Sequence, residues 1–442
     1  MLKKIFFPFL IIFAFSQIIA AQVYLNSVKI DEETNSDTTH YCFKKIEIFG
    51  NRKTKPNIIL RELLFSQDEF VQLSQIIAAQ KRVRSLALFT RVRFDITGDT
   101  EHYTLNITVN EQWYIFIYPT LYMNEKSWNK ISYGASLRYY NFLGRNIYLK
   151  IKAVHGYNPM YKFIYHNPWF LGNNKLYTKL ILFKRKVRSK SPAHNKLDDS
   201  RIGFDWVIGK RFGHFTFTGI DFKYIEISAS PETGLTVSSS GKDRLLSMSG
   251  SFGYDNRDLK EYPHKGWWLK LHGKVAGKSG WLPYYQYGVE IRRYVPIKQN
   301  VTLAVRSATI LSKGKIPIYD RTYFGYNERI RGRFYDIFEG ENLILGSAEI
   351  RFPIKKIEYF NLPLIPGLEN YTSQLKFGIS AGIFYDTGIT WFQNQKLAVK
   401  SFNSGFGFGL HFHLPYVDVL RVEGGFNHQQ DVQVIVDVGT AF

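Results

Sequence analysis

The stretch Val-Gln-Val-Ile-Val-Asp-Val-Gly-Thr-Ala-Phe occupies residues 432–442 of the chain. Valine takes every second position from Val432 to Val438, and the polar residues Gln433 and Asp437 lie between the valines. This period of two is that of a β-strand with two different faces. An apolar face beside a polar face suits a strand between lipid and a wet lumen, and we expect the ring of Phe442 at the membrane interface. The stretch therefore predicts a transmembrane β-barrel.

Segments of the same kind fill the chain from residue 113 onward, and sixteen are candidates for strands. They are 113–122, 131–141, 146–155, 160–167, 175–186, 198–209, 213–226, 243–254, 266–276, 282–294, 300–312, 342–352, 375–384, 404–413, 418–427 and 432–442. In the third segment, Leu149 and Ile151 alternate with Lys150 and Lys152. Because a lysine facing lipid at the bilayer midplane costs about 2–4 kcal/mol, we expect these lysines to face the lumen. We therefore expect a 16-stranded antiparallel transmembrane β-barrel over residues 113–442.

Residues 1–21 are typical of a secretory signal peptide. A positive end with Lys3 and Lys4 precedes a largely apolar run, and Ala20 and Ala21 offer a cleavage site before Gln22. A membrane anchor is the alternative, but the run is short and interrupted for a span of about 20 residues. Elsewhere no apolar run approaches that length, which excludes a helical transporter. We expect the polar segment 22–42 to be an N-terminal linker.

The amino-acid composition and net charge limit the kinds of partner that the chain can have. The chain has 8 Trp, 29 Tyr and 36 Phe, which aromatic girdles at two membrane interfaces would use, although an aromatic-rich secreted β-protein is an alternative. A formal net charge of +21 often indicates nucleic-acid binding, but the export signal argues against a nucleic acid as the partner of this chain. A cationic lumen, or loops facing outer-membrane lipids, accounts for the charge. The single cysteine, Cys42, allows no disulfide within the chain.

A small soluble module over residues 43–112 precedes the barrel. Its hydrophobic pattern predicts the order β-α-α-β-β, with Ile59, Leu60 and Leu63 on the apolar face of the first helix. The residues that identify it are Ile46-Glu47-Ile48-Phe49-Gly50-Asn51, Thr54-Lys55-Pro56 and Leu88-Phe89 before Val92. On these residues the module resembles a POTRA domain, the periplasmic unit of the BamA/TamA outer-membrane assembly and two-partner secretion superfamily (the bacterial surface antigen family). The chain has one such module, and many relatives have two or more.

The barrel region resembles the same superfamily in several blocks. The most diagnostic is Arg331-Gly332-Arg333-Phe334 followed by Glu349-Ile350-Arg351-Phe352-Pro353, and Phe384-Tyr385-Asp386-Thr387-Gly388 is a further block. The others are Asn141-Phe142-Leu143-Gly144-Arg145, Asn167-Pro168-Trp169-Phe170-Leu171-Gly172, Asp255-Asn256-Arg257-Asp258 with Pro263 and Gly266, and Ser404-Gly405-Phe406-Gly407. The first block departs from the family, in which the aromatic residue follows the glycine directly.

This resemblance implies that the sixth outer loop folds back into the barrel. There Arg331 would meet Asp386 and Glu349 on the inner wall, since a guanidinium offers a planar fork of donors to a carboxylate. Breaking a truly buried pair of this kind costs about 3–5 kcal/mol, so the contact would latch the loop. We therefore expect a loop latch of Arg331, Gly332, Phe334, Asp386 and Glu349. The alternative is that Arg331 is one more solvated loop charge.

The first and last strands of a closed barrel must pair, and the first contains Pro119. Proline has no N–H to donate and belongs at sheet edges. We hypothesise that the seam of segments 113–122 and 432–442, marked by Pro119 and Phe442, is weakly paired and opens sideways into the membrane. An unpaired edge would then template an incoming strand. A proline near a strand end that leaves pairing intact is the alternative.

An even number of strands places both ends of the barrel on one side. Because the module precedes the first strand, that side is expected to be the periplasm. The turns 141–146 and 415–418 are then periplasmic, and the longer segments 187–197, 227–242 and 313–341 are extracellular loops.

No metalloprotease, hydrolase or phosphate-binding motif is present, so we do not expect an enzyme. His411 and His413 share a strand face, but two ligands are too few for a typical metal site, and no cofactor is expected. The resemblance implies assembly and insertion of outer-membrane proteins. A two-partner-type secretion pore, or an outer-membrane barrel enzyme or passive pore, remain alternatives. The expected partners are unfolded outer-membrane or secreted polypeptides and periplasmic accessory proteins.

Overall fold

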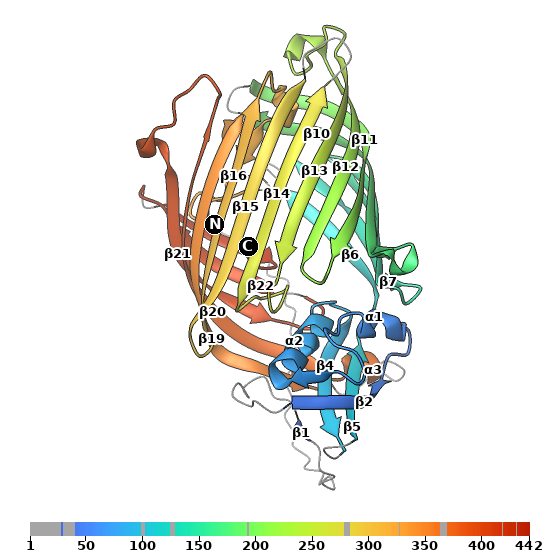
Figure 1. Cartoon of the computed structure of the whole chain (residues 1–442). Helices are drawn as coiled ribbons and strands as arrows, with labels where there is room; N and C mark the ends of the chain where they lie inside the picture. Colours follow the sequence, from blue (N-terminus) through green and yellow to red (C-terminus); the bar gives the residue numbers. More distant parts are fainter. Residues whose placement is uncertain are drawn as a thin grey trace.

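The computed structural model describes residues 28–29, 40–98, 102–123, 129–191, 194–277, 283–326, 328–362, 369–417, 419–429 and 431–442. The expected signal peptide and most of the expected linker lie outside these residues. The described residues form a small α+β module beneath one end of a large barrel-shaped sheet (Figure 1). Among them, no helix combines the length and the apolar character that crossing a membrane requires.

The module has five strands and two helices. They are β1 (Val28–Lys29), β2 (His40–Phe49), α1 (Pro56–Leu60), β3 (Phe70–Gln72), α2 (Leu73–Arg84), β4 (Phe89–Thr97) and β5 (Tyr103–Glu111). The sheet order is β1-β4-β5-β2-β3, so the expected β-α-α-β-β order gains the short strands β1 and β3. Helix α2 buries Ile76 and Val83 against the sheet, as apolar positions on one helical face require.

One detail of the module differs from the prediction. Leu60 was expected in the core, yet it is exposed, whereas Ile59 is fully buried. The reason is geometric, because neighbouring helical positions point about 100° apart and α1 has only 5 residues. Leu63 is buried, but it follows the end of the helix.

The barrel is an antiparallel sheet of 16 strands, in agreement with the predicted number. Its strands are β6 (Ile115–Met123), β7 (Ile131–Phe142), β8 (Ile147–Gly156), β9 (Met160–Phe170), β10 (Leu176–Ser191), β11 (His194–Phe212), β12 (Thr216–Ala229), β13 (Lys242–Asp255), β14 (Gly266–Gly277), β15 (Tyr284–Lys298), β16 (Val301–Lys313), β19 (Asn342–Phe360), β20 (Leu375–Trp391), β21 (Asn403–His413), β22 (Leu420–Phe426) and β23 (Val432–Val438). The connections hold β17 (Thr322–Phe324), β18 (Phe338–Gly340), α3 (Glu369–Thr372) and the 3-10 turns η2 (Gly172–Asn174), η3 (Pro231–Thr233), η4 (Ile318–Asp320) and η5 (Val399–Ser401).

The expectation of a loop at 187–197 was wrong. Strands β10 and β11 continue their ladder over the described residues of this segment, 187–191 and 194–197, with Val187 opposite Asp199 and Arg188 opposite Asp198. Cross-strand charge pairs stabilise the extension, since Lys186 and Arg188 lie 3.2 and 3.7 Å from the carboxylate of Asp198. The polar composition therefore marks an extension of these two strands rather than an irregular loop.

As expected from its alternation, β23 has an exposed apolar face and a second face that points into the barrel. Its four valines are 62–65% exposed on the outside of the sheet, whereas Ile435 on the other face is 1% exposed. In β8, Ile151 is likewise exposed outward, and Lys150 and Lys152 are half-buried on the opposite face.

The two ends of the sheet are β6 and β23. Between these strands, as far as the structure describes them, no ladder pair forms. Pro119 lies in the middle of β6 opposite Ala135 of β7. At the end of β6 near the module, the ring of Phe116 lies 5.8 Å from that of Tyr416, in the turn between β21 and β22.

The position expected for Phe442 was wrong. Strand β23 ends at Val438, and Gly439, at φ +94°, turns the chain away from the ladder. Phe442 is consequently buried inside the sheet against Tyr294 and Ala304, rather than at the membrane interface. The guanidinium carbon of Arg351 lies 5.5 Å from its ring centre.

Candidate functional site

The segment between β16 and β19 returns into the barrel. Its strands β17 and β18 pair with each other, and its residues Phe324 and Ile330 are each 1% exposed. They pack against Leu343 and Leu345 of β19 on the inner wall. This apolar contact holds the segment in place and brings the following residue, Arg331, to the wall.

Arg331 is the centre of the site. Its Nε and Nη2 donate to the two oxygens of Asp386 on β20, at 2.8 and 2.9 Å, which is the bidentate fork geometry. Nη1 donates to Glu349 of β19 and, at 3.1 Å, to Glu423 of β22. The backbone N–H of Arg331 also donates to Asp386, at 3.0 Å. One loop residue therefore contacts three strands of the wall.

The charges of this cluster are balanced. Besides Arg331, Arg351 donates to Glu349 at 2.6 Å, and Arg421 donates to Glu423 at 2.7 Å. Three buried arginines thus face the three buried carboxylates of Glu349, Asp386 and Glu423. Burying charge is tolerable only when each ion is paired and hydrogen-bonded, and this arrangement meets that condition for the carboxylates.

Glycine is required at two positions where the loop meets the wall. Gly332 has φ +91°, and a Cβ there would lie 2.3 Å from the carbonyl oxygen of Phe426. A Cβ on Gly405 of β21 would lie 1.8 Å from the carbonyl oxygen of Arg331. The absence of side chains lets the loop backbone approach the strands closely, as the Arg-Gly pair in the sequence suggests.

The aromatic residue of the expected latch does not join the cluster. Phe334 is half-buried, its N–H donates to the side chain of Gln433 on β23 at 2.7 Å, and the guanidinium of Arg329 stacks on its ring at 3.9 Å. The ring beneath Arg331 belongs instead to Phe384 of β20, at 3.8 Å. Arg333 occupies the position after Gly332 and pairs with Asp336 at 3.3 Å.

The structure thus brings together Arg331, Gly332, Asp386 and Glu349, and it places Phe334 beside them. Sequence reasoning did not identify Glu423, Arg421 or the role of the Phe384 ring. Glu423 lies in a strand whose side chains alternate between the two faces. Its even or odd position in that strand shows that it points inward, but nothing in the neighbouring sequence shows which residue it contacts. Of the expected seam residues, Pro119 lies on β6 at one end of the sheet, as predicted, whereas Phe442 lies inside the wall near Arg351.

A second layer of polar contacts surrounds the cluster. Tyr262, from the connection between β13 and β14, hydrogen-bonds Nδ1 of His411 at 2.9 Å, and His411 lies 3.6 Å from Glu423. His413 contacts the hydroxyl of Ser380 at 2.9 Å. Within the described part of the chain, no group of three potential ligands gathers that could hold a metal ion.

The same connection, residues 256–265, contacts the module. Glu261 lies between Arg84 of α2, at 3.3 Å, and Lys376 of β20, at 2.7 Å. Burial alone would raise the pKa of Glu261, but Lys376 and Arg84 hold its pKa below the usual value. Lys81 of α2 adds a contact to Asp258 at 3.6 Å. The module is therefore fixed to the connection that also supports the latch cluster.

Comparison with known proteins agrees with this arrangement. A sequence profile of the Omp85 superfamily domain matches residues 141–433, and a POTRA profile, described as surface antigen variable number repeat, matches residues 41–112. The chain is 22% identical over 428 residues to the outer membrane protein assembly factor BamA of Neorickettsia risticii (strain Illinois). The match covers 87% of this chain and 52% of that protein, so the chain spans about half the length of this curated relative.

Two solved structures are similar to this chain. One is BamA from Haemophilus ducreyi lacking POTRA domains 1–3, with a TM-score of 0.50, 14% identity, and coverage of 90% of this chain and 83% of that one. The other is CdiB from Acinetobacter baumannii, with a TM-score of 0.49, 12% identity, and coverage of 90% and 73%. At 14% identity, the BamA match shows the barrel and module architecture alone.

Proposed function

Because the chain belongs to the Omp85 superfamily, we propose that it is an assembly factor that inserts proteins into the outer membrane, working through its POTRA domain and a laterally opening seam. The barrel lies in the bacterial outer membrane, and the POTRA domain faces the periplasm. Unfolded outer-membrane polypeptides are the proposed substrates, and periplasmic accessory proteins are proposed partners.

The observation that carries this proposal is the pair of sheet ends, β6 and β23. Among the described residues no ladder pair joins them, so each carries backbone groups that an incoming strand could bind. Pro119 in the middle of β6 removes one donor from that strand. A seam with few hydrogen bonds opens at lower cost than any other strand pair of the barrel.

The buried latch supports the same proposal. The loop carrying Arg331 occupies the interior and contacts β19, β20 and β22, the strands that lead to the seam. A passive pore needs an open lumen. A loop that three carboxylates hold inside the barrel argues against an open lumen and therefore against a passive pore. We propose that the latch keeps this side of the barrel rigid while the seam opens.

Depletion followed by quantitative proteomics of the outer membrane tests the choice of function. Assembly predicts a broad loss of other β-barrel proteins after depletion. Loss of one exported polypeptide, with the other barrels unchanged, would instead indicate a secretion pore of the two-partner type. The readout is the abundance of each outer-membrane protein relative to an unperturbed inner-membrane protein.

A disulfide across the seam tests the mechanism. In a Cys42→Ser background, Ile117→Cys on β6 is combined in turn with cysteine at each outward valine of β23. The matched control joins Ile117→Cys to Leu137→Cys, which face each other on the β6–β7 ladder. We expect the seam disulfide to abolish assembly and the ladder disulfide to leave it intact. Full activity with a locked seam would refute lateral opening.

A further inference from the structure

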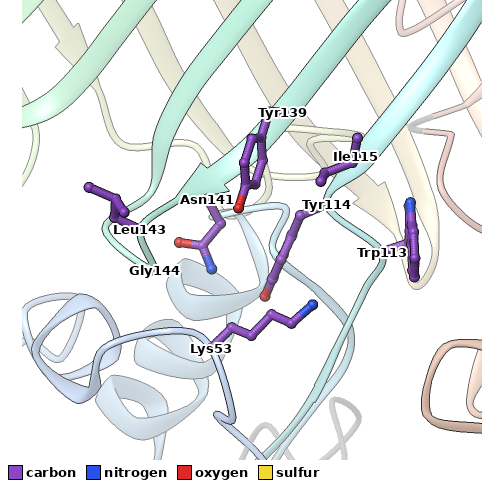
Figure 2. Close-up of a pocket in the computed structure, with 8 residues that line it drawn as sticks. All are labelled: Lys53, Trp113, Tyr114, Ile115, Tyr139, Asn141, Leu143 and Gly144. Carbon is purple, nitrogen blue, oxygen red and sulfur yellow. The ribbon is translucent and has the colours of Figure 1, made fainter.

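A cavity lies where the POTRA domain meets the base of the barrel. Its volume is about 300 Å³, and its lining comes from the loop after β2, the segment that enters β6, and the end of β7 with the turn that follows (Figure 2). Figure 2 shows Lys53, Trp113 and Tyr139 around this space. None of these residues belongs to the latch or to the seam contacts described above.

The floor of the cavity is fixed by buried hydrogen bonds. The hydroxyls of Tyr114 and Thr54 are 3.0 Å apart, and Asn141 donates to Thr54 at 2.8 Å. The N–H of Lys55 donates to the carbonyl of Gly144 at 3.0 Å. Since these bonds join the domain to the barrel, the cavity exists before any ligand arrives, and a ligand would not have to order it.

The cavity carries the positive charge of the Lys53 side chain. The ammonium of Lys53 donates to the hydroxyl of Tyr371 at 3.1 Å and lies 5.9 Å from the ring of Trp113. Glu111 is close in the fold, but its carboxylate accepts the backbone N–H groups of Lys53 and Thr54 at 2.6–3.0 Å. Over the described ranges, the Lys53 ammonium forms no ion pair with a carboxylate.

The cavity opens on the lipid side of the barrel. Ile115 begins β6 on its outward face and Leu143 lies in the turn after β7, and both are exposed. Trp113 is also exposed, and Tyr139 is an outward residue near the end of β7. Tryptophan and tyrosine at the end of membrane strands occupy the headgroup level, here on the periplasmic side where the POTRA domain lies.

We propose that this cavity binds the headgroup and glycerol region of an anionic glycerophospholipid from the periplasmic leaflet. Its phosphate pairs with the ammonium of Lys53, and an acyl chain extends along Ile115 and Leu143. Pockets for whole drug-sized ligands measure about 300–1,000 Å³, so a cavity at the lower limit suits the polar end of a lipid with its chains outside. A lipid bound there ties the POTRA domain to the membrane surface beside β6.

The test uses the full-length protein, delipidated in detergent, with native mass spectrometry during titration of phosphatidylglycerol. A lysine near a membrane surface contributes about 1 kcal/mol of attraction to anionic lipid, so Lys53→Gln should weaken binding about fivefold. Lys55→Gln is the matched control, because it removes the same charge from an exposed side chain that does not line the cavity. This control should bind like the unaltered protein.

Two further arms identify the ligand. Phosphatidylcholine, which is zwitterionic, should bind several-fold more weakly, and inorganic phosphate should not displace phosphatidylglycerol. Equal binding of both lipids, displacement by phosphate, or equal losses in Lys53→Gln and Lys55→Gln would each overturn the proposal. Retained heat-modifiable migration in electrophoresis shows that each variant is folded, so a loss of lipid cannot be attributed to a collapsed barrel.

Discussion

The latch gives the sharpest prediction, namely that Arg331→Ala releases the inward loop. Replacement by alanine removes both hydrogen bonds of the guanidinium to Asp386 and those to Glu349 and Glu423. It also removes the cation that lies 3.8 Å from the ring of Phe384. Two arginines, Arg351 and Arg421, then remain for the three carboxylates, so these ions leave the buried cluster with one uncompensated negative charge.

The magnitude follows from that uncompensated charge. Removing one partner of a buried, hydrogen-bonded ion pair costs about 3–5 kcal/mol. Every 1.4 kcal/mol changes an equilibrium about tenfold, so the released state of the loop should gain roughly a hundred- to several-thousand-fold in population. Arg331→Lys keeps the charge but loses the planar fork, and it should fall between the alanine variant and the unaltered protein.

Hydrogen–deuterium exchange of the peptide spanning residues 328–336 measures this release. Its protected amides include Arg331, which donates to Asp386, and Phe334, which donates to Gln433. The matched control is Arg329→Ala, since Arg329 donates to the carbonyl of Tyr326 and not to a carboxylate. We expect exchange to accelerate in Arg331→Ala and to change little in the control. Equal exchange in the two alanine variants would refute the buried latch.

Three further predictions address contacts of the loop and of the POTRA domain. Gly332→Ala should release the same loop at a cost of about 2 kcal/mol or more, seen by the same exchange assay, because its Cβ would meet the carbonyl of Phe426 at 2.3 Å and its φ is positive. Gly144→Ala should detach the POTRA domain, measured as faster proteolysis at the junction, because its Cβ would lie 2.0 Å from the carbonyl of Lys53. The pKa of Glu261 is lowered in the folded state, so its contribution to docking is present above the ordinary glutamate pKa and is lost as the pH falls through the folded value. Glu261→Gln should abolish that acid-induced change in domain separation, measured by fluorescence transfer, and an unchanged pH profile in this variant would contradict the assignment.

The strands could be predicted from the sequence because each lipid-facing side chain must be apolar whatever its neighbours are. That constraint is local, so alternation alone indicates β23 and its outward valines. The inward positions obey no such rule, since their partners come from distant strands. Glu423 accordingly had no signal of its own, although it is as buried as Glu349. Arg331 and Asp386 were found only through the family resemblance.

The errors have physical reasons of the same kind. In the sequence, the alternation of β23 continues through Phe442. In the structure, Gly439 has a positive φ, which no residue between Val432 and Val438 adopts, and the chain turns there. The interior then offers a buried site beside Tyr294. In segment 187–197 the polar residues suggested a loop, whereas cross-strand ion pairs allow the two strands to continue in water. In each case a contact distant in sequence decides the conformation.

Two consecutive residues, Glu261 and Tyr262, connect the POTRA domain with the latch cluster. Glu261 binds Arg84 of the POTRA domain, and Tyr262 hydrogen-bonds His411, which lies 3.6 Å from Glu423 of the latch cluster. Because the hydroxyl of Tyr262 and the carboxylate of Glu261 belong to one short connection, a displacement of the POTRA domain strains the contacts of both. A displacement of this domain therefore acts on the wall that holds the loop. The contacts supply a route for coupling, and the released loop expected in Arg331→Ala would be the second position that coupling requires.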